Sequence, residues 1–199
     1  MLTESKTPTL YDEHYYEDGI NRGLSCYENY RWIPEQTIPL CAYLCERLNI
    51  ERGATILDFG CAKGYMVKAF RLLGREAYGW DISDYALQFC THVAWPFGVT
   101  VDWIIAKDVL EHLPEDQINW QLSNFNCKHI FISVPLAENG KYLDPRDEKD
   151  ITHVIREPLA WWVETVRKHF RVLQHASTEF GPLKANSKPN SQGFIWAYK

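Results

Sequence analysis

The sequence lacks the long apolar runs of a membrane protein and the basic excess of a nucleic-acid-binding protein. No hydrophobic stretch approaches the roughly 20 residues that a bilayer-spanning helix needs. The first residues, MLTESKTPTLYDEHYY, do not follow the order of a basic and then an apolar segment that marks export. With 21 Lys and Arg against 26 Asp and Glu, the formal net charge is −5. We therefore expect a cytoplasmic protein that binds neither membranes nor nucleic acids.

The six cysteines do not have the spacing of a metal or redox site, because no Cys-x-x-Cys pair occurs. Cys41 and Cys45 lie one helical turn apart beside Leu40 and Leu44, which favours buried thiols on an apolar helix face. We expect no disulfide and no structural metal. The cysteines are Cys26, Cys41, Cys45, Cys61, Cys90 and Cys127.

The aromatic content of the chain indicates one folded domain. Eight Trp, eleven Tyr and nine Phe among 199 residues supply the apolar surface for a single core. The chain has no repeat, low-complexity tract or linker. We therefore expect one domain over residues 1–199, with an N-terminal arm or lid at 1–34 and a core at 35–199.

Short apolar runs alternate with amphipathic segments. The pattern predicts helices at 34–48, 63–73, 83–90, 114–122 and 158–170, and strands at 54–59, 75–80, 101–106, 129–134, 170–176 and 193–199. Alternation of this kind predicts an α/β, Rossmann-like fold, in which helices cover both faces of a mostly parallel sheet. The last two strands, separated by a segment rich in Gly, Pro and Asn, are expected to form an antiparallel C-terminal edge.

A glycine-rich turn follows the first predicted strand. Gly60 and Gly64 allow the backbone to approach a ligand and to present free N–H groups. Asp81, at the end of the next strand about twenty residues on, can accept both hydroxyls of a ribose. The pairing predicts a nucleoside site. The spacing Gly60-x-Ala62-x-Gly64 differs from the Gly-x-Gly-x-x-Gly dinucleotide pattern, and no Gly-Lys-Ser/Thr phosphate loop occurs.

Three motifs together resemble the class I S-adenosylmethionine-dependent methyltransferases. LDFGCAKGY (57–65) is similar to the first motif of that family, and GWDIS (79–83) to its ribose-binding strand end. AKDVLEHLP (106–114) is similar to its fourth-strand segment. The resemblance covers about residues 35–135, and it implies a methyltransferase with S-adenosylmethionine as cofactor.

The resemblance also implies which residues bind the cofactor. Asp58 would lie beneath the methionine amino group, Asp81 at the ribose hydroxyls and Ile82 against adenine. Lys107 and Asp108 would border the sulfonium. The loop that lines the methionine and ribose part would consist of Gly60, Cys61, Ala62, Lys63 and Gly64.

Two features depart from the family pattern. Ala62 stands where a glycine is commonest, and an alanine is tolerable there if its φ is negative. Only about twenty residues separate Asp81 from the strand at 101–106, where the family usually fits a third strand and an acidic, adenine-contacting loop. Residues 91–100 would have to serve that purpose, and one strand is expected to be missing.

Transfer to a hydroxyl needs a base that removes its proton. His153 is the first candidate because it lies in a long polar connection after the strand at 129–134. A role in bracing the following helix remains open for it. Asp108 is the second catalytic candidate.

His112 is expected to orient the helix that follows the fourth strand, although Asp108, Glu111 and His112 also resemble the divalent-metal set of some quinone-biosynthesis O-methyltransferases. No further ligand is identifiable from the sequence, and we expect no metal.

Aromatic residues outside the glycine-rich loop are further candidates for contacts with the cofactor and the substrate. Tyr27 and Tyr30, in the aromatic N-terminal segment, are predicted to close over the cofactor because aromatic faces suit a sulfonium. For most aromatic residues of this segment, ordinary packing of the arm onto the sheet is the favoured interpretation. Trp161 and Trp162 are adjacent and cannot both face the core of one helix, so one of them is expected to reach the substrate.

The absence of two motifs narrows the range of possible methyl acceptors. The fourth strand lacks the Asn/Asp-Pro-Pro-Tyr/Phe sequence of N-methylating enzymes, and no Pro-Cys nucleophile of cytosine-C5 enzymes occurs. We expect O-methylation of a sugar, glycan or other small molecule. Two alternatives remain open. One is a non-catalytic S-adenosylmethionine-binding or partner-binding module. The other is an NAD-dependent oxidoreductase, although the Tyr-x-x-x-Lys motif of short-chain enzymes is absent.

The ribose assignment yields a direct prediction. Replacing Asp81 with Ala removes a charged hydrogen-bond acceptor, which costs on the order of 1.5–3 kcal/mol. Calorimetric titration with S-adenosylhomocysteine should show at least roughly tenfold weaker binding than the unmodified protein. Unchanged affinity would rule out Asp81 as the ribose ligand.

Overall fold

The computed structural model describes residues 10–94, 98, 100–181 and 187–199. The predicted arm is therefore described only from residue 10, and residues 95–97, 99 and 182–186 of two predicted connections lie outside the description. The helices are α1 (Glu13–Glu17), α2 (Gly19–Arg22), α3 (Pro34–Arg47), α4 (Tyr65–Leu72), α5 (Asp84–Leu87), α6 (Glu115–Asn124) and α7 (Leu159–Arg167). The strands are β1 (Thr55–Phe59), β2 (Glu76–Trp80), β3 (Val101–Lys107), β4 (Cys127–Pro135), β5 (Ala137–Glu138), β6 (Lys141–Tyr142), β7 (Val172–Ser177) and β8 (Gln192–Tyr198). Two 3-10 turns, η1 (Leu110–His112) and η2 (Asp147–Lys149), lie in the connections.

Six strands form one sheet in the order β2-β1-β3-β4-β8-β7. The pairs β1–β2, β1–β3 and β3–β4 are parallel, whereas β8 is antiparallel to both β4 and β7. The predicted parallel sheet with an antiparallel C-terminal pair is confirmed. The antiparallel strand itself lies inside the sheet, and β7 is the edge.

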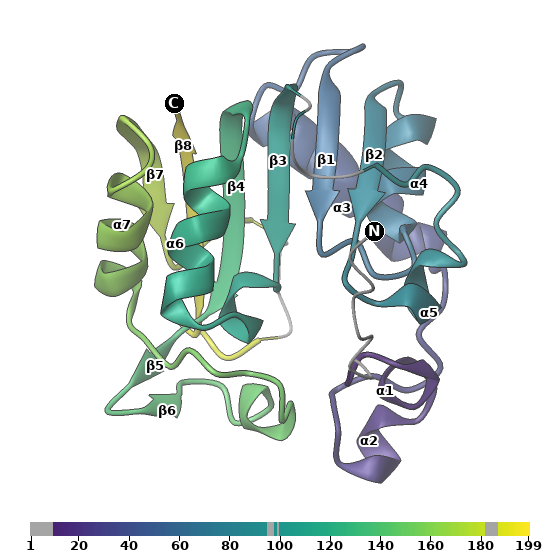
Figure 1. The fold of residues 1–199 in the computed structure, drawn as a ribbon, viewed down its shortest axis with the longest axis vertical. Helices are drawn as coiled ribbons and strands as arrows, with labels where there is room; N and C mark the ends of the chain where they lie inside the picture. Colours follow the sequence, from purple (N-terminus) through teal and green to yellow (C-terminus); the bar gives the residue numbers. More distant parts are fainter. Residues whose placement is uncertain (1–9, 95–97, 99, 182–186) are drawn as a thin grey trace, which may run out of the picture.

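Helices cover both faces of the sheet (Figure 1). On one face, α3 and α4 pack against the sheet through a cluster that includes Leu44 and Phe70. On the other face, α6 and α7 bury Ile118 and Trp162 with Phe59 of β1. Because both faces are covered, the central strands have nearly continuous apolar sequences. Within the described residues, no helix combines the length and apolar character needed to cross a membrane.

The starts of the helices follow local chemistry. Pro34 opens α3, where its fixed φ and missing N–H cost nothing. Ser83 caps α5 by accepting a hydrogen bond from the Ala86 N–H at 3.0 Å. Cys41 and Cys45 are buried on α3, as their helical spacing predicts. The predicted helix at 83–90 is shorter than expected, since only 84–87 is α-helical.

The described residues of the connection after β2 form no full strand, in agreement with the expectation from its length that one strand of the family pattern is missing. In the described part of 91–100, a single parallel bridge joins Val93 to Gly79. The Gly79 N–H donates to the His92 carbonyl at 2.8 Å, and the Ala94 N–H donates to the Gly79 carbonyl at 3.0 Å. The outer edge of β2 is therefore partly covered, without a full strand beside it.

The N-terminal arm lies at the carboxyl ends of the parallel strands (Figure 1). Its α1 contributes Tyr15, whose hydroxyl donates to Asp150 Oδ2 at 2.6 Å. On the other side, the Ser83 hydroxyl donates to the Tyr11 carbonyl at 2.5 Å. The arm thus connects the segment after β2 with the long connection after β6.

Gly64, at the start of α4, ends the turn after β1 and packs closely against Cys90. Its φ is +74°, and an added Cβ would lie 2.5 Å from Cys90 Sγ and 3.1 Å from the Cys90 Cα. Gly53 has a φ of +79° with no atom within 4 Å of an added Cβ, so it is a matched control for backbone strain alone. Urea unfolding should show that Gly64→Ala lowers the free energy of unfolding by about 1–3 kcal/mol more than Gly53→Ala. Equal losses would mean that contact with Cys90 is not the constraint.

Candidate functional site

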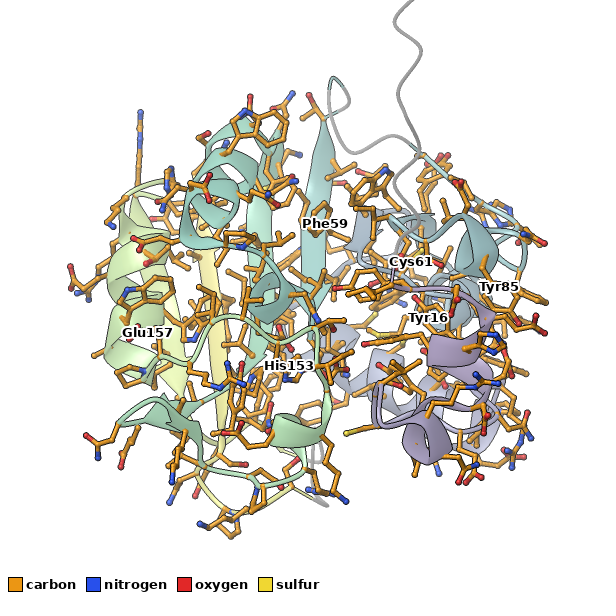
Figure 2. The ribbon with its side chains drawn as sticks, turned by 60° about the horizontal axis from the view of Figure 1, so that its bottom comes forward. Tyr16, Phe59, Cys61, Tyr85, His153 and Glu157 are labelled. Carbon is orange, nitrogen blue, oxygen red and sulfur yellow. The ribbon has the colours of Figure 1, made fainter. Side chains whose placement is uncertain are left out.

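A cavity of about 270 Å³ opens at the carboxyl ends of β1, β2 and β3. Ligands bind at this end of parallel sheets. The N-terminal arm and α6 close its sides, and Figure 2 shows Tyr16 of the arm and His153 of the connection after β6 at this end of the sheet. The lining residues are Tyr11, Tyr15, Tyr16, Tyr27, Phe59, Gly60, Ala62, Trp80, Asp81, Ile82, Asp108, Val109, His112, Leu113, Gln117 and Gln121.

Asp81 holds two turns of the cavity wall together. Its Oδ2 accepts a hydrogen bond from the Ala62 N–H at 2.7 Å, and its Oδ1 accepts one from the Ser83 N–H at 2.8 Å. Burial raises the pKa of Asp81, although these backbone N–H groups lower it. Each carboxylate oxygen has two lone pairs, so Asp81 can also accept hydroxyl donors of a ligand.

The conformation of Ala62 differs from the expectation. Its φ is +47°, so the condition of a negative φ is not met. In this turn the Ala62 N–H points at Asp81 and donates a hydrogen bond to it. Ala62 makes this bond in a left-handed backbone conformation, which is unfavourable for a residue with a β-carbon. At Gly60, in contrast, an added Cβ would lie 2.4 Å from Val109 Cγ2, so the close approach of the two loops requires glycine there.

The cavity fits the chemistry of the S-adenosylmethionine that the resemblance implies. Asp81 offers acceptors for ribose hydroxyls, and Ile82, Val109 and Leu113 offer apolar walls for a purine. Burial raises the pKa of Asp58, beneath the loop, to about 7. A ligand ammonium group near Asp58 would favour its ionised form.

Some residues of the predicted loop support the cavity without lining it. The ammonium of Lys63 is buried, donates to the Tyr30 carbonyl at 2.8 Å and pairs with Glu17 of α1. It also lies 4.7 Å from the centre of the Phe89 ring. Lys63 therefore binds the arm to the loop. The predicted cofactor residues absent from the lining are Asp58, Cys61, Lys63, Gly64, Lys107 and Tyr30.

Asp108 lines the cavity in a constrained conformation. Its φ is +55°, and its Oδ2 lies 2.6 Å from the Lys107 ammonium. Its Oδ1 accepts a hydrogen bond from the Ser133 hydroxyl at 3.1 Å. The adjacent strands β3 and β4 thus hold this carboxylate at the cavity wall.

His112 lines the cavity through η1, and the connection after η2 holds its ring. The Thr152 hydroxyl donates to Asp150 Oδ1 at 2.5 Å, and Thr152 Oγ lies 2.7 Å from His112 Nδ1. Because the single hydroxyl proton of Thr152 goes to Asp150, the His112 Nδ1–H must donate to Thr152. We assign this tautomer from the hydrogen bonds. It leaves a lone pair on His112 Nε2.

His153 lies behind His112, with the two ring centroids 4.6 Å apart. Its Nδ1–H donates to the Asp147 carbonyl at 2.9 Å, and its Nε2 lies 3.9 Å from Glu111 Oε1. One ligand atom from each of Glu111, His112 and His153 lies within 4.8 Å of the others, a spacing that could hold a metal ion. His153 is not among the residues that line the cavity.

The two tryptophans of α7 do not line the cavity either. Trp162 is fully buried in the core, and Trp161 packs against the rim of the same cluster. The ring centroids are 5.0 Å apart. Their assignment to the substrate stays a prediction, to which the described contacts of α7 add no support.

Sequence reasoning missed several cavity residues. His112 was expected to be structural, and its partners Thr152 and Asp150 come from a connection about forty residues further along. Tyr15 and Tyr16 lie in an aromatic segment without periodicity, where packing was the favoured interpretation for most residues. Each forms part of the cavity wall while being almost fully buried.

Comparisons with known proteins agree with this geometry. A family model described as a methyltransferase domain matches residues 31–178. The chain is similar to a SAM-dependent methyltransferase from Archaeoglobus fulgidus, with 18% identity, a TM-score of 0.61, and coverage of 82% of this chain and 95% of that chain. It is also similar to a structure of the complex between the Haloferax volcanii Trm112 methyltransferase activator and a methyltransferase (15% identity, TM-score 0.66, 94% and 97% coverage). A third similar structure is the magnesium protoporphyrin IX methyltransferase of Synechocystis PCC 6803 with bound SAM (14% identity, TM-score 0.60, 98% and 99% coverage). No curated protein sequence matches significantly.

Proposed function

Because the chain belongs to the methyltransferase-domain family of S-adenosylmethionine-dependent enzymes, we propose that it methylates a hydroxyl oxygen of a sugar, glycan or other small molecule. The observation that carries this proposal is a neutral imidazole in the cavity wall, with a lone pair on His112 Nε2. S-adenosylmethionine supplies a methyl group on a sulfonium, which any aligned nucleophile can attack. The protein then has to align the acceptor, exclude water and remove the hydroxyl proton.

His112 is suited to remove that proton. Burial and the neighbouring His153 lower its pKa to about 4, so the ring is neutral near pH 7. His112 Nε2 would accept the proton as the oxygen attacks the methyl carbon. The hydrogen bond from His112 Nδ1–H to Thr152, which is bonded to Asp150, fixes the ring and stabilises its charged form. We place His153, the first candidate from the sequence, behind this base as a positioning residue.

The arm favours an acceptor with a ring. Four tyrosines, Tyr11, Tyr15, Tyr16 and Tyr27, line the cavity, so its wall combines aromatic faces with hydroxyl groups. Such a wall suits the apolar face and the hydroxyl groups of a sugar, and it also suits a flat aromatic alcohol. A partner-binding role is the competing proposal, supported by the likeness to a structure that contains a methyltransferase activator.

A second mechanism is favoured by the grouping of Glu111, His112 and His153. Each histidine donates its Nδ1–H to a fixed acceptor, the arrangement common among metal-binding histidines. A divalent ion held there would lower the pKa of the acceptor hydroxyl directly. Asp108, one of the three residues that the sequence suggested for a metal, is not part of this group.

The two mechanisms predict different kinetics. If His112 is the base, His112→Asn should lower turnover by about 10²–10⁴-fold and leave the affinity for S-adenosylhomocysteine nearly unchanged. His153→Asn, the matched control, should cost far less. Because the pKa of His112 is lowered to about 4, turnover should stay constant from pH 8 to about 5 and fall below it, with an identified acceptor.

The metal mechanism gives another pattern. A chelator would abolish turnover, His112→Asn and His153→Asn would be equally damaging, and Mn²⁺ would restore the wild-type rate after dialysis. A turnover that survives His112→Asn without loss would contradict both mechanisms.

A further inference from the structure

We propose that Gln121, assisted by Gln117, recognises the adenine edge of the cofactor in this protein. This inference rests on the proposed function, because it requires S-adenosylmethionine in the cavity. Both glutamines lie on α6, one helical turn apart, and both line the cavity that Asp81 helps to form. Residues at this spacing share one helix face, so their amides can act on one ligand.

The amide oxygen of Gln121 has no hydrogen-bond donor among the described residues. This atom, Oε1, is buried. A buried amide oxygen normally has a hydrogen bond, because leaving it unpaired is unfavourable. A half-turn of the amide exchanges its oxygen and nitrogen at little steric cost. Gln121 can therefore present either an acceptor or a donor to a ligand that enters the cavity.

Adenine matches this pair of groups. A glutamine side chain can accept from the N6 amino group of adenine while donating to N7, a two-point pairing that discriminates adenine from other bases. The ribose end of the ligand is fixed by Asp81, and the base must lie beside it. The neighbouring lining residues Trp80, Ile82 and Leu113 are apolar and suit the faces of a purine. In the same wall, Gln121 supplies a buried amide oxygen without a donor, and the exposed Gln117 lies one helical turn away.

The short connection after β2 explains why α6 would take this role. A single bridge at Val93 stands in place of a third strand in the described part of that connection. The space beside β1 and β2 is lined by Phe59 and Trp80, whose rings stack with centroids 5.0 Å apart. Helix α6 borders the same cavity through Gln117 and Gln121. Among the described residues, this face of α6 therefore borders the cavity beside Trp80, where an adenine would lie.

Calorimetry with two ligands tests the proposal. S-adenosylhomocysteine carries the N6 amino group, whereas S-inosylhomocysteine has a carbonyl there and a hydrogen on N1, with the same ribose and homocysteine parts. The unmodified protein should bind S-adenosylhomocysteine at least roughly tenfold more tightly than S-inosylhomocysteine. Gln121→Leu should weaken binding of S-adenosylhomocysteine by about tenfold and remove most of the preference. Gln36→Leu, on the exposed start of α3, is the matched control and should leave both affinities unchanged.

The outcomes separate this proposal from the proposed function. Equal binding of the two ligands by the unmodified protein would overturn it without any variant, and so would full preference in a folded Gln121→Leu protein. If Gln121→Leu raises only the KM for the acceptor, the amide binds the acceptor and the proposal fails while the methyltransferase function stands. If neither ligand binds the unmodified protein, the proposed function fails first and the adenine contact falls with it.

Discussion

The site depends on one carboxylate that is shared between two backbone turns. Asp81 accepts the N–H groups of Ala62 and Ser83, so the loop after β1 and the loop after β2 adopt one fixed arrangement. The cost is visible at Ala62, which takes a left-handed conformation, and in the pKa of Asp81, which burial raises. A ligand with two hydroxyl groups would relieve part of that desolvation. The same contact therefore shapes the cavity and would favour a ribose within it.

A second carboxylate organises the opposite wall. Asp150 is buried and accepts hydrogen bonds from the Tyr15 hydroxyl and from the Thr152 hydroxyl. The first fixes the N-terminal arm and the second fixes the ring of His112, so closure of the cavity and orientation of the base are coupled. Loss of either contact would loosen both. This coupling explains why the cavity is lined by segments that are distant in the sequence.

The fold was predictable from the sequence because its signals are local. Apolar runs such as 54–59 and 129–134 mark buried strands, and the turn at Gly60 marks the ligand end of the sheet. The short connection after Asp81 predicted a missing strand, and the described residues of that connection form a single bridge to β2. The proposed base was harder to predict, because the placement of His112 in the wall depends on Thr152 and Asp150, which only tertiary folding brings near. Gln121 gave no signal, since a glutamine on an amphipathic helix is usually solvated.

The central claim is that this cavity binds S-adenosylmethionine, and thermal unfolding with competing ligands tests it most directly. At about 100 times its dissociation constant, S-adenosylhomocysteine should stabilise the protein by about 2.7 kcal/mol, which raises the melting temperature by several degrees. NAD at the same concentration should leave the melting temperature unchanged, because the loop lacks the dinucleotide glycine pattern. Stabilisation by NAD, with none by S-adenosylhomocysteine, would contradict the account and favour an oxidoreductase.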